Sequence, residues 1–324
     1  MCLLIALSGV LDGMPLLVAA NRDELYARPA ESITVLRDHG PRILGGRDLV
    51  AGGTWLAVNS RGVVVGLTNQ PSGRGRDDTR RSRGELPLAF AAYPDAATAV
   101  AKVCAELDPA DYNPCWLLVG DRHSLFSVGM AGGHHPVVSQ LPPGSYVLEN
   151  VPLDDYSAKA RQVADMVTAG IAGKSGKTRV NGANGAGAAG EAIGTNGGSR
   201  SGTPAGLSLP SDAGPPGGMN VPPGTDLPPG PDLPPVPDLL GGMNDAERAL
   251  ATVLRDHRHA SGTGVPAAGE QVRPAELSAA CVHTASYGTR SAIIVSIGDT
   301  GLPRIWVADG PPCRVPFRDV SALW

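Results

Sequence analysis

The segment from residue 171 to residue 243 most constrains what this chain can fold into. It is rich first in Gly, Ala, Asn and Ser and then in Pro, and residues 226–231 (DLPPGP) are almost repeated by residues 232–237 (DLPPVP). Such a composition buries too little apolar surface to offset the entropy lost on ordering, so we predict a disordered insertion. Residues 1–170 and 244–324 then form a single domain around it, because long surface loops cost little extra entropy as they grow. The proline repeat is either a spacer or a ligand for a partner's aromatic groove.

The remaining sequence alternates hairpin patterns with helical ones. Antiparallel hairpins with helices grouped between them are typical of an α+β fold and not of a wound βαβ sheet. Two antiparallel sheets faced by helix layers is the most economical packing, which predicts a four-layer αββα sandwich. Capping-box spacing, in Ser82 with Glu85 and in Asn244 with Glu247, marks two helix starts. The expected strands are 3–7, 16–20, 54–58, 62–68, 116–119, 124–128, 146–148, 292–297 and 304–308, and the expected helices begin near 82 or cover 96–107, 156–167 and 245–257.

The first predicted hairpin brings polar residues to Cys2 with no other part of the fold assumed. Its turn is predicted at the Asp-Gly dipeptide of positions 12–13, so that paired positions sum to 25 and Asp23 lies opposite Cys2. Strand side chains alternate between the two faces of a sheet. Asn21 and Asp23 therefore share one face, and Arg22 takes the other.

An N-terminal cysteine combines a nucleophile and a base in one residue. Methionine aminopeptidases accept a small second residue, so we expect loss of Met1 to leave Cys2 with a thiol and a free α-amine. These groups titrate near ~8.5 and ~7.7–8.0, so at neutral pH each is close to the protonation state that acyl transfer requires. Asp23 is placed to hold the protonated α-amine, and a nearby cation would favour the thiolate. The strand-end residues Asn69 and Asn150 are neutral candidates for stabilising an oxyanion.

Several short motifs occur in order through both halves of the chain and skip the predicted insertion. Each is weak alone, whereas the ordered set covers nearly all the residues expected to fold. On these motifs the chain resembles the NRDE family, also described as transport and Golgi organisation protein 2-like. The matching motifs are Met1-Cys2, ANRDE (20–24), Arg28-Pro29, GGTWL (52–56), LTN (67–69), RGEL (83–86), LEN (148–150) and YGTRS (287–291).

This resemblance implies a fold and a set of catalytic residues. The NRDE family is similar to the N-terminal nucleophile hydrolases, whose fold is a four-layer αββα sandwich. Its relatives in the choloylglycine hydrolase and penicillin V acylase group cleave amides with an N-terminal cysteine. Matched to that group, Cys2 is the nucleophile and Asp23 its orienting acid. Asn69 and Asn150 are the oxyanion and positioning amides, and Arg290 is the late arginine of the site.

Three further residues of the NRDE motif would support this site: Asn21, Arg22 and Glu24. One position departs from the amidases. They carry an arginine before the asparagine, where this chain has Ala20, and here an arginine follows the asparagine instead. The role of Arg22 therefore stays open.

Two function classes are compatible with the resemblance. In the first, the Cys2 thiolate attacks a linear amide, forms a thioester and passes the acyl group to water or another acceptor, with no cofactor required. In the second, the protein is a non-catalytic haem or acyl-lipid carrier, because the resemblance is to a family whose eukaryotic members are linked with Golgi organisation and secretion and whose members have been proposed to handle haem or acyl lipids. The expected ligand is a small-molecule acyl amide in the first class and a lipid-like molecule or haem in the second.

Composition restricts partners and compartment. Lys and Arg (27) nearly balance Asp and Glu (31), so no global basic field would draw nucleic acid or an anionic membrane. The five cysteines contain no C-x-x-C pair, which indicates neither a disulfide framework nor a zinc knuckle and favours a reducing compartment. No run approaches the ~20 apolar residues of a transmembrane segment, and the apolar start lacks a basic region, which argues against an export signal. We therefore predict a soluble, cytoplasmic protein and leave its oligomeric state open.

Two histidine pairs and one arginine cluster elsewhere in the sequence are further candidates for binding sites. The pair His134-His135 lies in a Gly/Pro turn, and His257 and His259 end a predicted helix, where a histidine interacts favourably with the helix dipole. We assign no metal ligand to either pair. A cluster of arginines is either a solvated loop or a phosphate or carboxylate contact near the mouth of the site. These arginines are at positions 74, 76, 80, 81 and 83.

Overall fold

The structure is a computed structural model that describes residues 2–71, 75–131, 133–153, 157–172, 242–260 and 275–324. The predicted insertion lies outside the described residues except at its two ends, so its disorder stays a prediction. Those ends belong to the folded part of the chain. Ile171 is the last residue of a helix and is buried, and Met243 packs in the same hydrophobic core.

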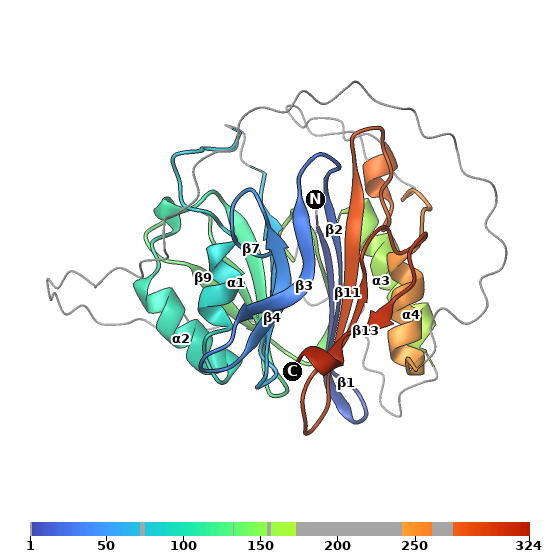
Figure 1. The fold of residues 1–324 in the computed structure, drawn as a ribbon, viewed down its shortest axis with the longest axis horizontal. Coiled ribbons are helices and arrows are strands. Elements are labelled where there is room, and N and C mark those ends of the chain that lie inside the picture. The colour runs from blue at the N-terminus through green and yellow to red at the C-terminus, as the bar shows by residue number, and fades with distance from the viewer. Residues whose placement is uncertain (1, 72–74, 132, 154–156, 173–241, 261–274) are drawn as a thin grey trace, which may run out of the picture. The chain divides into compact units, whose positions relative to one another are not determined.

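Two antiparallel sheets lie face to face at the centre of the molecule (Figure 1). The order of strands in the first sheet is β10-β1-β2-β11-β12-β13, so the first hairpin is hydrogen-bonded to strands from after the predicted insertion. Its strands are β10 (Gly144–Leu148), β1 (Leu3–Leu11), β2 (Met14–Leu25), β11 (Tyr287–Ile297), β12 (Arg304–Ala308) and β13 (Arg318–Asp319).

The second sheet follows the order of the sequence, from β3 to β9. Antiparallel neighbours can be joined by short connections, and the long connection from β6 to β7 carries the two α-helices of this half of the chain. Its strands are β3 (Ala30–Arg37), β4 (Ile43–Asp48), β5 (Leu56–Asn59), β6 (Val64–Asn69), β7 (Cys115–Gly120), β8 (Leu125–Gly129) and β9 (Val137–Leu141).

Helices cover the outer face of each sheet (Figure 1). One apolar core lies between the first sheet and its helices, a second between the two sheets, and a third between the second sheet and its helices. The prediction of an α+β, four-layer αββα sandwich is confirmed. No described helix is long and apolar enough to cross a membrane. The first sheet is covered by α3 (Ala158–Ile171) and α4 (Asp245–Leu254), and the second by α1 (Glu85–Phe90) and α2 (Ala96–Glu106).

Local capping signals predicted one helix start correctly and another wrongly. Asn244 and Glu247 form the predicted capping box of α4, with the Asn244 side chain accepting from the Glu247 amide at 2.9 Å. The box predicted at Ser82 and Glu85 is wrong. Helix α1 begins after Gly84 without a side-chain cap, and Glu85 pairs with Arg81 instead at 2.6 Å. The predicted extension of α4 to position 257 is also wrong, since the helix ends at Leu254.

The sequence patterns missed strands β3, β4, β9 and β13. Strand β9 is largely exposed, and β4 contains the pair Gly45-Gly46, a residue type that is rare in strands. The Trp55 side chain covers Gly46 so closely that a Cβ there would meet the indole at 2.2 Å. Glycine is thus used inside this strand for close packing, which overrides its poor strand propensity.

A bulge in the first hairpin changes the predicted register by one residue. Near the turn, Leu11 pairs with Met14, and the positions sum to 25 as predicted. Gly9 then takes a positive φ of 62°, the ladder shifts, and Leu3 pairs with Asn21. The predicted pairing of Cys2 with residue 23 is therefore wrong by one position.

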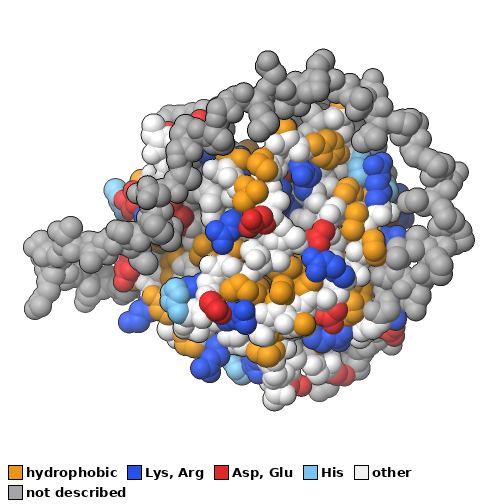
Figure 2. All heavy atoms as spheres, viewed as in Figure 1, with side chains coloured by type: hydrophobic (Ala, Val, Ile, Leu, Met, Phe, Trp, Pro, Cys, Tyr) orange, Lys and Arg blue, Asp and Glu red, His pale blue; other side chains and the backbone are white. Residues whose placement is uncertain are grey.

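Side chains of both charge signs are interspersed over the face of the molecule shown in Figure 2. The described surface also carries exposed ion pairs, among them Arg42 with Asp38 at 3.1 Å and Arg47 with Glu31 at 3.5 Å. Such pairs on the surface stabilise the fold little. They do place positive and negative side chains next to each other, in keeping with the nearly balanced charge of the sequence.

Candidate active site

Cys2 lies directly before β1, half-buried at the end of the first sheet. Its Sγ accepts a hydrogen bond from the backbone N–H of Asp23 on β2. Leu3 belongs to the core under α3 and α4, whereas Leu4 belongs to the core between the sheets. Since strand side chains alternate, Cys2 faces the space between the two sheets. Its neighbour across the ladder is then Arg22, which packs on Trp55 of that same inner core.

Burial raises the pKa of the Cys2 thiol above its ordinary value, and the nearby charge of Asp23 raises it further. The charge of Arg22 and the hydrogen bond from the Asp23 amide lower the pKa without offsetting the effect of burial. The thiol is therefore mainly protonated at neutral pH. A nucleophilic role requires a base that removes this proton as the sulfur attacks.

Asp23 points away from the inner core into a buried polar cluster under α3. Its Oδ1 accepts a hydrogen bond from Thr289 Oγ1 at 2.6 Å, and its Oδ2 lies 3.7 Å from Lys159 Nζ. Lys159 is also 3.7 Å from Glu149, which accepts a hydrogen bond from Ser157. The cluster thus contains two buried carboxylates and one buried ammonium group.

The pKa of the Asp23 carboxyl is raised, chiefly by burial. Lys159 and the hydrogen bond from Thr289 oppose this shift, and the charge of Glu149 adds to it. Removal of Lys159 would therefore leave two buried acids close together without compensation. The lysine favours the charged form of Asp23 and so offsets part of the cost of desolvation.

Sequence reasoning missed Lys159 and Glu149. Lys159 lies in the first turn of α3, directly after the Ser157 cap, and is only 4% exposed. A cation is unfavourable at this end of a helix dipole, so its place there was a signal that a buried anion lies nearby. Glu149 stands inside the LEN motif, in which only Asn150 had been given a role.

Asn150 lies next to the Cys2 end of the first sheet. Leu148, the last residue of β10, pairs with Leu4 in the β1–β10 ladder, and Asn150 follows Leu148 by two residues just as Cys2 precedes Leu4 by two. Asn150 is buried, and among the described residues no protein group donates to its Oδ1. This oxygen is therefore free of structural hydrogen bonds within the described part of the chain.

Arg22 occupies the opposite face of β2 from Asp23. Its guanidinium lies 4.6 Å from the centre of the Trp55 ring, and its Nη2 is 3.3 Å from Asp48. Asp48 also accepts from Arg28 Nε at 2.7 Å. Burial raises the pKa of Asp48, but the hydrogen bonds from Arg28 and from nearby backbone amides outweigh it, so the pKa is lowered overall. Arg22 is thus a buried cation on the side of Cys2.

Asn21 and Glu24 have structural contacts. Asn21 Nδ2 donates to the carbonyl oxygens of Leu254 at 2.9 Å and Ala280 at 2.8 Å, which connects β2 to the end of α4. Glu24 is half-buried and lies 3.8 Å from Arg28. Both residues support the strand that presents Arg22 and Asp23.

Two other residues predicted for the site are placed elsewhere. Arg290 is the bulged residue of β11, and its Nη1 donates to the carbonyls of Leu25, Tyr26 and Arg28, so it holds the turn after β2. Asn69 ends β6 and is exposed. The structure therefore brings Cys2, Arg22 and Asp23 together, with Asn150 two residues beyond the end of the neighbouring strand β10, but does not show Arg290 or Asn69 in contact with them.

Arg83 joins the candidate site from the second sheet's helix layer. It is half-buried, its Nη1 donates to Pro114 O at 3.0 Å, and burial lowers its pKa. A thiolate at Cys115 or Cys2 would act in the opposite direction and raise the pKa of Arg83, so this guanidinium would favour a negative charge on either sulfur. The other described arginines of this cluster, at positions 76, 80 and 81, form exposed ion pairs, as in the solvated-loop interpretation.

The GGTWL and RGEL motifs meet beside this site. A Cβ at Gly53 would lie 2.4 Å from the backbone of Gly84, and Thr54 N donates to Gly84 O at 3.0 Å. Only two glycines allow this approach of backbone to backbone. The contact fixes the strand that carries Trp55 against the segment that carries Arg83.

One cavity among the described residues lies far from this chemistry. It has a volume of about 370 Å³ and is lined by Ser8, Gly9 and Pro15 near the first hairpin turn, together with residues of the β7–β8 and β9–β10 connections. Ser8 is six residues along β1 from Cys2, which at ~3.3 Å per residue is about 20 Å. We place the candidate site at Cys2 because the buried charges converge there.

Four histidine and cysteine side chains form a second polar group, which the sequence analysis missed. The donor atoms of His257, Cys281, His283 and Cys313 all lie within 4.8 Å of one another. His259, which we had considered with His257, is exposed and is not part of the group. The available signal was the C-x-H spacing at 281–283, since alternate residues of an extended chain face the same side.

Fold and site together define an αββα protein with a half-buried cysteine at the start of a central strand, beside a cluster of buried charges. The family model described as Transport and Golgi organisation 2 matches residues 1–182, which is more than half of the chain. The chain belongs to this family, and the family recognised from its motifs is thereby confirmed.

Curated relatives from three mammals share this family. The Transport and Golgi organization protein 2 homolog of Bos taurus is 35% identical over 148 residues, which is 43% of this chain and 51% of the relative. The Homo sapiens homolog is 34% identical over 150 residues, again 43% of this chain and 51% of the relative. The match therefore spans about half the length of these relatives.

Solved structures with a similar arrangement have low sequence identity to this chain. The C2A mutant of the conjugated bile acid hydrolase from Clostridium perfringens has a TM-score of 0.34 and 14% identity, and covers 51% of this chain and 57% of its own. The Caenorhabditis elegans ortholog of N-acylethanolamine-hydrolyzing acid amidase has a TM-score of 0.39 and 12% identity, and covers 51% and 77%.

Proposed function

We propose that this protein is an N-terminal cysteine hydrolase that cleaves a linear acyl amide, or transfers its acyl group, through a thioester on Cys2. The observation that carries the proposal is the surroundings of the Cys2 sulfur, which has the Asp23 amide as donor and Arg22 and Arg83 as nearby cations. The buried Asp23, Lys159 and Glu149 lie just behind it. Buried charges are expensive to maintain, and pKa shifts of this kind are concentrated at functional sites.

The proposed reaction uses the chain's own groups at each step. Once Met1 is removed, the α-amine of Cys2 accepts the thiol proton while Sγ attacks the amide carbonyl carbon. The C–N bond then breaks, the proton passes to the leaving amine, and the acyl group remains on sulfur. Water attacks the thioester, releases a carboxylic acid and restores the thiol. The same two half-reactions with another nucleophile in place of water give acyl transfer.

Residues near Cys2 have distinct parts in this proposal. Asp23 holds the charged α-amine near the sulfur, and Lys159 keeps Asp23 ionised. Arg22 and Arg83 favour the thiolate, which opposes the effect of burial on its pKa. Asn150, whose amide lies at the end of β10, donates to the oxyanion of the tetrahedral intermediate. Compartment is part of the proposal: five free cysteines fit a reducing environment such as the cytoplasm.

A panel of fluorogenic acyl amides of increasing chain length tests the proposal. The wild-type chain should release the amine, and Cys2→Ala should not. Cys104→Ala is the matched control, since Cys104 is a half-buried cysteine on α2 in another layer and should leave turnover unchanged. Intact mass must show that Met1 is absent from active protein.

A carrier would behave differently in the same experiments. Saturable binding of haem or a long-chain acyl lipid by wild type, with no amine release from any amide and no dependence on loss of Met1, would contradict the hydrolase and identify the alternative. Haem binding is followed by its Soret band, in wild type and in Cys2→Ala. Active protein that retains Met1 would contradict the role given to the α-amine.

A further inference from the structure

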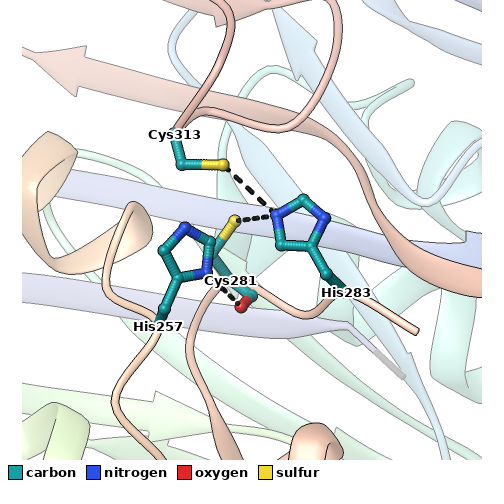
Figure 3. Close-up of side chains that lie close together, drawn as sticks. All are labelled: His257, Cys281, His283 and Cys313. Atoms are coloured by element: carbon teal, nitrogen blue, oxygen red, sulfur yellow. Dashed lines mark hydrogen bonds between the residues drawn. The ribbon is translucent and has the colours of Figure 1, made fainter. Parts of the chain in front are cut away.

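Three separate segments bring two cysteines and two histidines to one point (Figure 3). His257 follows the end of α4, Cys281 and His283 lie in the segment that leads into β11, and Cys313 lies in the connection between β12 and β13. Cys281 is buried, His283 and Cys313 are half-buried, and His257 is exposed. The group lies apart from Cys2 in the sequence, and the proposed hydrolase reaction uses none of its members.

The spacing within the group matches a tetrahedral metal site. His283 Nε2 lies 3.6 Å from Cys281 Sγ and 3.2 Å from Cys313 Sγ. In tetrahedral zinc sites, with Zn–S of ~2.3 Å and Zn–N of ~2.0–2.1 Å, a nitrogen and a sulfur ligand are about 3.5 Å apart. The two measured separations lie on either side of that value. One imidazole nitrogen thus faces both sulfurs at the distance that a shared metal would set.

His257 has the second contact that metal-binding histidines usually make. Its Nδ1 is 3.1 Å from the carbonyl oxygen of Cys281, as Figure 3 shows. A proton on Nδ1, donated to this carbonyl, leaves the lone pair on Nε2 for a metal. The ligand nitrogen of His257 lies within 4.8 Å of both sulfurs, so the ring belongs to the same group of donors.

The two sulfurs belong to one compact group of donor atoms. The ligand atoms of Cys281 and Cys313 lie within 4.8 Å of each other and of the two imidazoles. A divalent cation replaces the protons of such thiols when they become ligands, because the thiolate is the form that binds.

We propose that His257, Cys281, His283 and Cys313 bind one Zn²⁺ in a closed Cys₂His₂ site. Two thiolates with two imidazoles in a tetrahedral arrangement is a donor set that zinc prefers, whereas hard cations prefer oxygen. Four protein ligands leave no open position, so the ion is structural and not catalytic. A disulfide between the two cysteines would account for neither imidazole.

Such an ion would hold in place the segment that supports Asp23. Between the two ligands Cys281 and His283, Val282 donates its N–H to Thr289 Oγ1 at 2.9 Å and accepts from Thr289 N at 2.8 Å. Thr289 Oγ1 in turn donates to Asp23 at 2.6 Å. The metal thus connects the end of α4 and the C-terminal loop to the strand that holds the Cys2 site. The proposed ion would stabilise the fold whether or not Cys2 reacts with a substrate.

Metal analysis of the full-length chain tests the site directly. After reduction and dialysis against chelator, the protein is titrated with Zn²⁺ or Co²⁺ and freed of unbound metal. Wild type should retain about one ion per chain, as four ligands define one site. Cobalt should give the strong visible absorption of a tetrahedral complex together with a thiolate charge-transfer band. His257→Ala and Cys313→Ser should lose the ion or these bands, and His259→Ala and Cys104→Ser should keep both.

A second measurement uses the wild-type chain alone, so it tests the site even where a variant fails to fold. Zinc should slow alkylation of Cys281 and Cys313 at least tenfold, and leave Cys104 unaffected, as read by peptide mass spectrometry. Zinc that neither binds reduced wild type nor protects these two cysteines would overturn the proposal. Zinc bound equally by wild type and Cys313→Ser would overturn the ligand set. Cys281 and Cys313 found joined as a disulfide, with no zinc uptake after reduction, would assign the pair to redox chemistry instead.

Discussion

The two faces of β2 differ sharply at the NRDE motif, although the residues are adjacent in sequence. On one face, Asp23 lies in a cluster with Thr289, Lys159 and Glu149 that is almost inaccessible to solvent. On the other, Arg22 packs on Trp55 and pairs with Asp48, which is itself partly exposed. The first face depends on compensated charges that are fully buried, and the second on stacking and a part-buried ion pair. A strand alternates its side chains, so one short motif serves two layers of the fold.

The largest expected effect comes from the buried face. Lys159→Met leaves Asp23 and Glu149 as neighbouring buried acids, so the free energy of unfolding should fall by about 3–5 kcal/mol. Urea unfolding measures the change. Lys102→Met is the matched control, because Lys102 is exposed on α2 and should change stability little.

A double variant sharpens that result. Adding Glu149→Gln to Lys159→Met removes one of the two uncompensated acids and should recover part of the lost stability. Equal stability of Lys159→Met and wild type would mean that the buried charges do not depend on one another. Loss of a charge from the buried face of β2 would then cost no more stability than loss of Arg22 from the opposite face.

Substitution on the opposite face should cost less. Arg22→Met loses the stacking on Trp55 and the 3.3 Å contact with Asp48, but Asp48 keeps its 2.7 Å bond to Arg28. No buried charge is left alone, so we expect a loss of about 1–2 kcal/mol in the same urea experiment. Arg47→Met, at an exposed pair, should have no measurable effect. A loss for Arg22→Met as large as that for Lys159→Met would remove the contrast between the faces.

The smallest effect is a pH dependence on the Arg22 face. The pKa of Asp48 is lowered in the folded state, so its contribution to stability is present above the unfolded value of ~3.9 and is lost as pH falls through the folded pKa. Between pH 7 and pH 3, Asp48→Asn should therefore lose less stability than wild type, by less than about 1 kcal/mol. Asp38→Asn, at an exposed pair, is the control. Identical slopes for wild type and Asp48→Asn would show that Arg28 and Arg22 do not hold this carboxylate.

Local signals predicted much of this architecture. The hairpin at the start of the chain, helix α2 and the Asn244 capping box depend on residues close together in sequence, and each is found in the structure. The register of that hairpin was missed by one residue, because a bulge at Gly9 cannot be read from alternation alone.

Non-local packing explains what the sequence did not predict. Gly46 lies in a strand because Trp55 covers it, and Lys159 is buried because two acids from other segments meet it. Arg290 turns toward backbone carbonyls through a bulge in β11 that no motif spacing announces. Cys313 meets His257 only after the C-terminal connection folds back over the first sheet.

The most direct test of the central claim is to trap the acyl group on the protein. Wild type is mixed with an activated long-chain acyl ester, quenched in acid and mapped by peptide mass spectrometry, with Cys2→Ala treated in the same way. We predict an N-terminal peptide that begins at Cys2, lacks Met1 and carries a hydroxylamine-labile acyl group on sulfur, absent from Cys2→Ala. Equal acylation of wild type and Cys2→Ala, or no acylation of Cys2 by the activated ester, would contradict the proposed thioester on Cys2.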